Sequence, residues 1–247
     1  VFLISILYTV LKTKEYPPKD LETFKKEKKE NRFVHDFLFS LKNMPVTMKK
    51  LGLIQFFSWF AFFTTWSMAT PALTDYVYKA PAPDKTAFDF SIPAQEQAFN
   101  IANKAFQTAS DDVGSAMGIY GLSSMVFALL LTFYAAKRSV NRKLVHMFSL
   151  VAGGIGFLLM GLGQASLLNV SFILIGISWG SILSMPYAML SSSVDEKRMG
   201  MMMGLFNMFI VIPMIIQILT MQFFVYDLLG NDPVNVIRLA GVFLILA

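Results

Sequence analysis

The chain has 247 residues, of which 55% are hydrophobic and 15% are charged, and its mean hydropathy is +0.56. This composition excludes an ordinary water-soluble domain and is typical of a membrane protein with several spanning helices. The formal net charge is +5, and the chain contains no cysteine, which excludes disulfides and thiolate chemistry.

The chain starts with an apolar run at residues 1–11, which we interpret as the end of a spanning helix. Pro17 and Pro18 follow and end that helix. Because the chain both begins and stops inside an apolar run, we expect it to be a piece of a longer protein.

Residues 12–50 are predicted to form a long cytoplasmic loop. Within it, Val34, Phe37, Leu38 and Leu41 form a narrow apolar stripe at helical spacing. This pattern predicts an amphipathic helix along the inner membrane surface, although a solvated linker helix without a functional role gives the same pattern.

The positive charges are unevenly distributed between the apolar runs. Three alternate connections carry 17 of the 21 lysines and arginines. By the positive-inside rule these connections are cytoplasmic. The charge is thus explained by topology, and we predict no nucleic-acid partner.

Residues 50–78 are predicted to form a complete span with a polar and aromatic face. Gln55, Trp59, Trp66 and Thr70 lie on that face at helical spacing. An aromatic ring can pack against the C–H face of a sugar while amides and hydroxyls bond its OH groups. The stripe therefore predicts either a sugar-binding wall or helix packing.

Residues 80–112 are too polar to span and are expected outside, with a short surface helix around residues 95–108. Residues 113–136 form the next predicted span, in which Gly114, Gly118 and Gly121 permit close helix contact. A further span is expected at residues 144–163.

Residues 170–217 read as two apolar spans joined by the charged turn Asp195-Glu196-Lys197-Arg198. In the first span Gly176, Gly180, Ser184 and Tyr187 form a small, polar stripe. The mid-span amide of Asn207 in the second span needs a hydrogen-bond partner. It is therefore a candidate ligand contact or a link to a neighbouring helix.

Three prolines lie inside predicted spans, and we expect each to interrupt its helix. They are Pro71, Pro186 and Pro213. Spanning helices tolerate proline where neighbouring groups or a water-filled cavity satisfy the freed backbone. The last two helices are therefore expected to border a cavity or an interface.

Ionisable side chains are absent from the middle of every predicted span, since Asp75 and His146 lie near span ends. We therefore expect any ion-coupling group outside this segment. No nucleophile and base pair, metal-ligand cluster or phosphate loop is present, so we predict no enzyme, no metal and no cofactor.

The order of spans around a long basic loop resembles the C-terminal half of a major facilitator superfamily transporter. The stretches SILSMPYAMLSS, MGLFNMFIVIP, QFFSWFAFFTTW and KEYPP resemble the sucrose:proton symporter-like group, related to the solute carrier 45 sugar transporters and the glycoside:cation symporters. The resemblance implies an all-α polytopic bundle, with residues 1–11 ending the sixth helix and residues 51–247 running from the seventh to the start of the twelfth. The N-terminal half of the same transporter would be its partner.

This resemblance implies proton- or sodium-coupled transport of a di- or oligosaccharide by alternating access, in a bacterial inner membrane. Sucrose and maltose-like sugars are equally allowed, because Met214 and the Thr64-Thr65-Trp66 run depart from the patterns of related carriers. The candidate substrate contacts are Gln55, Trp59, Trp66, Ser184, Tyr187 and Asn207, and the candidate gating residues are Pro71, Gly180, Pro186 and Pro213. Two alternatives remain: an exporter of drugs or other small molecules on the same fold, and a non-transporting membrane sensor or scaffold that docks through residues 12–50.

Overall fold

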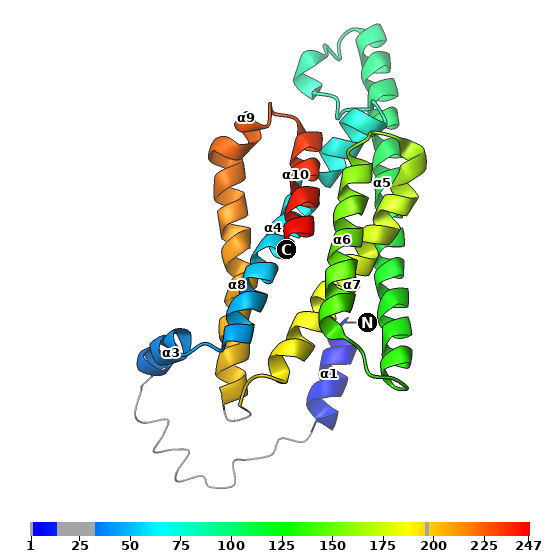
Figure 1. Ribbon diagram of the computed structural model, residues 1–247. Helices are drawn as coiled ribbons and strands as arrows, with labels where there is room; N and C mark the ends of the chain where they lie inside the picture. The colour runs from blue at the N-terminus through cyan, green and yellow to red at the C-terminus, as the bar shows by residue number, and fades with distance from the viewer. Residues whose placement is uncertain (1, 14–32, 196–197) are drawn as a thin grey trace. The chain divides into compact units, whose positions relative to one another are not determined.

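The computed structural model describes residues 2–13, 33–195 and 198–247. All regular secondary structure in these ranges is helical (Figure 1). The chain divides into two compact units, Val1–Asn43 and Met44–Ala247.

The first unit contains helices α1 (Phe2–Lys12) and α3 (Phe33–Lys42). Helix α3 covers the residues of the predicted stripe, and Leu38 and Leu41 on that stripe are exposed. Its position on a membrane surface stays a prediction. Residues 14–32 of the predicted loop lie outside the described residues.

The second unit is a bundle of long helices with short helical pieces at the connections (Figure 1). In order, its elements are α4 (Val46–Pro71), the π-helix η1 (Ala72–Val77), η2 (Lys85–Ala87), α5 (Pro93–Ala135), α6 (Arg142–Met160), η3 (Ala165–Leu167), α7 (Leu168–Ser191), α8 (Met199–Thr220), the π-helix η5 (Met221–Val225), α9 (Tyr226–Leu228) and α10 (Pro233–Leu246).

Four helices in the described ranges are long and apolar enough to cross a membrane by length and composition. They are Pro93–Ala135, Arg142–Met160, Ala165–Ser191 and Met199–Thr220. Helix α4, which covers most of the span predicted at residues 50–78, is not among them although it has 26 residues. Its tryptophans, threonines and serines lower its hydropathy, while α10 is apolar but has only 14 residues.

The prediction that prolines interrupt their helices is wrong for Pro186 and Pro213, whereas the α-helix does end at Pro71. Helix α7 continues through Pro186 and α8 continues through Pro213. At Pro71 the chain passes directly from α4 into the π-helix η1, so the backbone stays helical to Val77. The Thr74 hydroxyl donates to the carbonyl of Thr70 at 3.0 Å, which is one of the ways a hydroxyl supports helical backbone around a proline.

Helix α5 is longer than predicted, because its polar and apolar parts form one helix. With 43 residues at 1.5 Å per residue it is about 64 Å long, roughly twice the hydrocarbon thickness of a bilayer. The separate surface helix expected around residues 95–108 is therefore wrong. Figure 1 shows the N-terminal part of α5 extending past the end of α6.

Two glycines on the predicted polar stripe of α7 pack against α5. A β-carbon at Gly180 would lie 3.0 Å from the carbonyl oxygen of Ser124, and one at Gly176 would collide with the carbonyl of Tyr120. The Ser123 hydroxyl on α5 also donates to the carbonyl of Ile173 at 2.8 Å. This part of the stripe therefore makes a helix contact.

The three glycines of α5 behave differently. No described atom lies within 4 Å of a β-carbon built at Gly114, Gly118 or Gly121. The close helix contact expected there is not found among the described residues.

The end of α6 is joined to α10 by one side chain. Arg238 donates from Nη2 and Nε to the carbonyl oxygen of Gly161, at 2.7 and 3.2 Å. Asp232 caps α10 by accepting from the backbone N–H of Val234 at 2.8 Å. These contacts fix the end of the bundle opposite the basic turn between α5 and α6.

Candidate functional site

All three tryptophans of the chain meet in one cluster. The ring centroid of Trp179, on α7, lies 5.3 Å from that of Trp59 and 5.0 Å from that of Trp66, both on α4. The two α4 rings are 6.4 Å apart, and all three pairs are edge-to-face. Edge-to-face packing matches the positive edge of one ring to the negative face of another.

Further aromatic rings extend this tryptophan cluster toward α5. Phe62 lies 5.0 Å from Trp179, and Tyr120 of α5 lies 6.3 Å from the same indole. Phe63 contacts Trp66 edge-to-face at 5.4 Å. Helices α4, α5 and α7 therefore share one aromatic centre.

The two predicted tryptophans differ in accessibility. Trp59 is only 8% exposed, whereas Trp66 is 41% exposed. Trp59 thus mainly supports the cluster through packing, and Trp66 presents ring surface to what lies outside this chain. A stacking platform needs such an open ring face.

Several buried polar atoms on α4 have no hydrogen-bond partner among the described residues. They include both side-chain polar atoms of Gln55, Nε1 of Trp59 and Oγ1 of Thr64. Neighbouring hydroxyls on the same helix are satisfied internally, since Thr65 donates to the carbonyl of Ala61 at 3.0 Å. Buried polar groups are normally paired, with protein or with water, so the free atoms of Gln55 and Trp59 are positions where a polar partner would be stabilised.

Tyr187 and Asn207, two candidate residues from different predicted spans, contact each other. The Tyr187 hydroxyl donates to Oδ1 of Asn207 at 2.8 Å and so joins α7 to α8. The ring of Tyr187 packs edge-to-face on Phe206 at 5.4 Å, while Asn207 is exposed. Among the described residues, the amide nitrogen of Asn207 has no acceptor and can donate to another molecule.

Ser184 lies apart from both groups. Its hydroxyl donates to the carbonyl of Gly180 at 2.7 Å, and it lines a small cavity with Leu131 and Thr132 of α5. Its role as a substrate contact stays a prediction, as do the gating roles of the three prolines and Gly180.

Trp179 is the cluster member that sequence reasoning missed. Trp179 lies between Gly176 and Gly180 but is not on the small, polar face that these glycines share. The helical spacing of that face therefore does not include it among the candidate residues. The sequence does contain a signal for Trp179, because tryptophan is rare and the chain has only three. An indole in the middle of a span also needs a hydrogen-bond partner for its N–H.

The fold and these sites define a polytopic helical membrane protein in which polar and aromatic groups meet between helices. The chain belongs to the Major Facilitator Superfamily, whose family model matches residues 1–218. It is accordingly a membrane transporter. No curated protein matches the chain in a sequence search.

Proposed function

We propose that this transporter moves a di- or oligosaccharide, driven by a proton or sodium gradient, through alternating access of two halves. The observation that carries the proposal is the tryptophan cluster with its one half-open ring, Trp66, beside unpartnered polar atoms of α4. The N-terminal half of the same transporter would face this surface across the substrate path.

The aromatic ring and the polar side chains of this site match the two kinds of surface that a sugar presents, its C–H faces and its OH groups. The open ring of Trp66 can pack on the C–H face of a pyranose. The amide of Gln55 is fully buried and has one donor and one acceptor group without partners among the described residues, so it would bond a vicinal pair of OH groups in a conformation of the transport cycle that exposes it. Tyr187 and Asn207 supply a second polar position on α7 and α8.

The resemblance in sequence narrows the substrate class. It is our reason for proposing sucrose or a maltose-like glucosyl sugar as substrate and a bacterial inner membrane as location. The same resemblance is the reason to put a proton or sodium ion before other driving forces.

Equilibrium binding of radiolabelled maltose and sucrose to the complete purified transporter tests the substrate class. We expect Trp66→Ala to weaken binding by about tenfold, because one stacking contact of 1–1.5 kcal/mol is lost. Trp66→Phe should retain most of the affinity, since it keeps a ring. Phe133→Ala, which removes an exposed ring of α5, should bind as wild type does.

Two results would contradict the proposal. Wild type that binds neither sugar but binds lipophilic cations would favour the drug exporter. Function that survives Trp66→Ala but is abolished by deleting residues 23–41 would favour the sensor or scaffold.

A further inference from the structure

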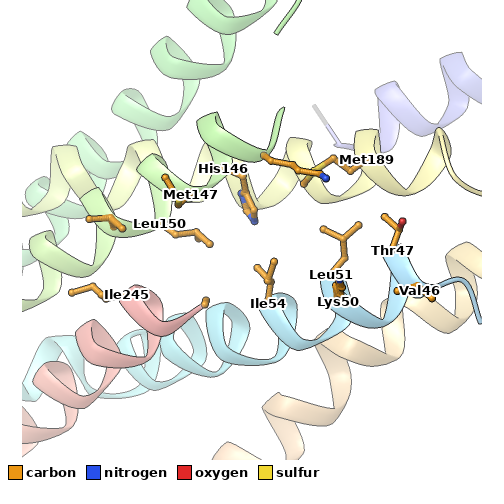
Figure 2. Close-up of a pocket in the computed structure, with 13 residues that line it drawn as sticks. Val46, Thr47, Lys50, Leu51, Ile54, His146, Met147, Leu150, Met189 and Ile245 are labelled. Atoms are coloured by element: carbon orange, nitrogen blue, oxygen red, sulfur yellow. The ribbon is translucent and has the colours of Figure 1, made fainter. Parts of the chain in front are cut away.

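Helix α6 borders two cavities with two of its faces. His146 and Leu150 are turned toward α4 and line the first cavity, as Figure 2 shows. Leu144, Val145 and Phe148 lie on another face of α6 and line a second cavity, on the side of α5. We call this second cavity the α5–α6 crevice.

The α5–α6 crevice has a volume of about 520 Å³, which is within the range of small-molecule sites. Phe127 contributes from α5 and Phe148 from α6, and Ile177 contributes from α7, against which α5 and α6 both pack. The lining residues all lie between positions 127 and 177, in helices that the structure describes without a gap. Phe148 is 65% exposed, so the crevice opens onto the surface of the bundle.

The short turn between α5 and α6 forms one end of the crevice. Ser139, Val140 and Asn141 of this turn line it, and the exposed side chains of Lys137 and Arg138 directly precede them. Figure 1 shows the turn at the lower right, where it joins the ends of α5 and α6. The charge distribution predicts that this end of the bundle is cytoplasmic.

The positive charge of this turn has no acidic residue near it in the sequence. Residues 113–194 contain no aspartate or glutamate, and their lysines and arginines are Lys137, Arg138, Arg142 and Lys143. The last two point elsewhere: Nη1 of Arg142 donates to a carbonyl oxygen of α7 at 2.6 Å, and Lys143 lines the first cavity. The charge at the end of the crevice therefore comes mainly from Lys137 and Arg138.

We propose that the α5–α6 crevice binds one anionic phospholipid. The phosphate lies against Lys137 and Arg138, and one acyl chain lies in the crevice along Leu144 and Phe148. Basic pockets between spanning helices on the cytoplasmic side suit the headgroups of such lipids. The site is separate from the proposed sugar path, and the inference does not depend on the substrate.

The two parts of the crevice together select this ligand over simpler ones. A free phosphate ion would satisfy the two cations but would leave the apolar wall from Phe127 to Phe148 uncovered. An apolar helix of a partner protein would cover the wall but would bring no negative charge to Lys137 and Arg138. Only a molecule with an anionic head and a hydrocarbon tail complements both parts.

Native mass spectrometry of the complete purified transporter tests the inference. The protein is titrated with phosphatidylglycerol, which is anionic, or with phosphatidylcholine of the same acyl chains, which is zwitterionic. We expect one phosphatidylglycerol to bind more tightly than any phosphatidylcholine. The double variant Lys137→Ala, Arg138→Ala should weaken the binding of that one lipid by about thirtyfold, because each basic residue beside an anionic headgroup contributes about a factor of five.

The matched control is the double variant Lys85→Ala, Lys104→Ala. It also removes two exposed lysines, but they lie in the polar segment and the N-terminal part of α5, far along the chain from the basic turn. We expect it to bind phosphatidylglycerol as wild type does. Equal affinity for the two lipids, or equal losses in the two double variants, would overturn the inference.

A second measurement needs no variant and locates the acyl chain. Phosphatidylglycerol with a photoreactive group in its acyl chain is bound to wild type at one lipid per protein and activated by light. We expect the crosslinked peptides to come from residues 127–148, on α5 and α6. Crosslinks confined to other helices would contradict the site.

Discussion

At the scale of single residues, some buried polar side chains on α4 have hydrogen-bond partners within their own helix and others have none. Ser58 and Thr65 donate to carbonyls of their own helix, at 2.9 and 3.0 Å, and are complete without any other partner. Gln55 is equally buried but leaves both of its polar atoms unpaired. An unpaired buried amide destabilises the folded protein unless another molecule completes it.

This difference predicts a variant that separates binding from stability. Gln55→Leu removes the unpaired amide at similar volume, so we expect the thermal midpoint in detergent to stay or to rise. The KM for sugar uptake should rise by about tenfold, since two hydrogen bonds to the substrate are lost. Ser58→Ala is the control and should leave KM unchanged. A strong fall in the midpoint with unchanged KM would mean that Gln55 has only a structural role.

A second residue-scale prediction concerns the polar segment before α5. The backbone N–H and hydroxyl of Thr86 donate to Asp84 and lower the pKa of its carboxyl, and those of Ser91 lower the pKa of Asp89 in the same way. A lowered folded-state pKa stabilises the folded loop above the unfolded pKa, and this stabilisation is lost as pH falls through the folded value.

We therefore expect amide exchange at Thr86 and Ser91 to speed up, relative to its intrinsic rate, only in acidic solution. Asp84→Asn should remove the pH dependence at Thr86 and leave that at Ser91 in place. Exchange protection at Thr86 that stays constant through the acid range in wild type would contradict this account.

At the scale of elements, glycine spacing predicted that helices approach closely but not where they do so. On α5, a β-carbon would have free space at the regularly spaced Gly114, Gly118 and Gly121. On α7, a β-carbon at Gly176 or Gly180 would meet backbone and side-chain atoms of α5. Spacing alone gives a face of small residues, and only the partner helix decides whether that face is used.

The two glycine sets predict opposite responses to the same substitution. Gly180→Leu should destabilise the protein by about 1–3 kcal/mol, because the new side chain would collide with α5 near Ser124 and Phe127. Gly118→Leu should be neutral or slightly stabilising, because leucine favours the helix and the described chain leaves room for it. Thermal unfolding of both variants in detergent measures the difference, and equal losses would show that α7 and α5 do not pack as described.

The three prolines also show that a local sequence signal does not determine the conformation of a helix. Proline removes one backbone donor and crowds the preceding turn, which is why an interruption was expected at Pro71, Pro186 and Pro213. In the folded chain α7 and α8 stay helical through Pro186 and Pro213, and at Pro71 the α-helix passes into the π-helix η1. Proline identified the special positions but not the conformation that the chain adopts there.

At the scale of the whole molecule, composition and hydropathy were sufficient for the class of fold, because spanning helices must satisfy every backbone group internally. The all-helical, polytopic character follows from that pattern, whereas the superfamily is shown by the family model that matches residues 1–218. The sequence also predicts that Trp59 and Trp66 share one helix face, where their ring centroids lie 6.4 Å apart, and that the Asn207 amide needs a partner, which is the Tyr187 hydroxyl. The roles of these residues in transport stay predictions.

The rest of the site depends on contacts that no local pattern contains. Trp179 joins the cluster only because α4 and α7 cross at that level. His146 lies near the end of its helix in sequence, where water would be expected, yet its side chain is only 2% exposed and its Nδ1 lies 2.9 Å from the Ser181 hydroxyl of α7. Both contacts form between side chains of different helices, α4 with α7 and α6 with α7.

The central claim is that the tryptophan cluster belongs to a sugar path driven by an ion gradient. The most direct test is uptake of radiolabelled maltose and sucrose into proteoliposomes that contain the complete transporter, with and without an imposed proton gradient, for wild type and Trp59→Ala. Our account predicts gradient-driven uptake of at least one sugar by wild type and its loss in Trp59→Ala, because removing this buried ring collapses the support of Trp66 and Trp179. Uptake of neither sugar by wild type, or equal uptake by both proteins, would contradict it.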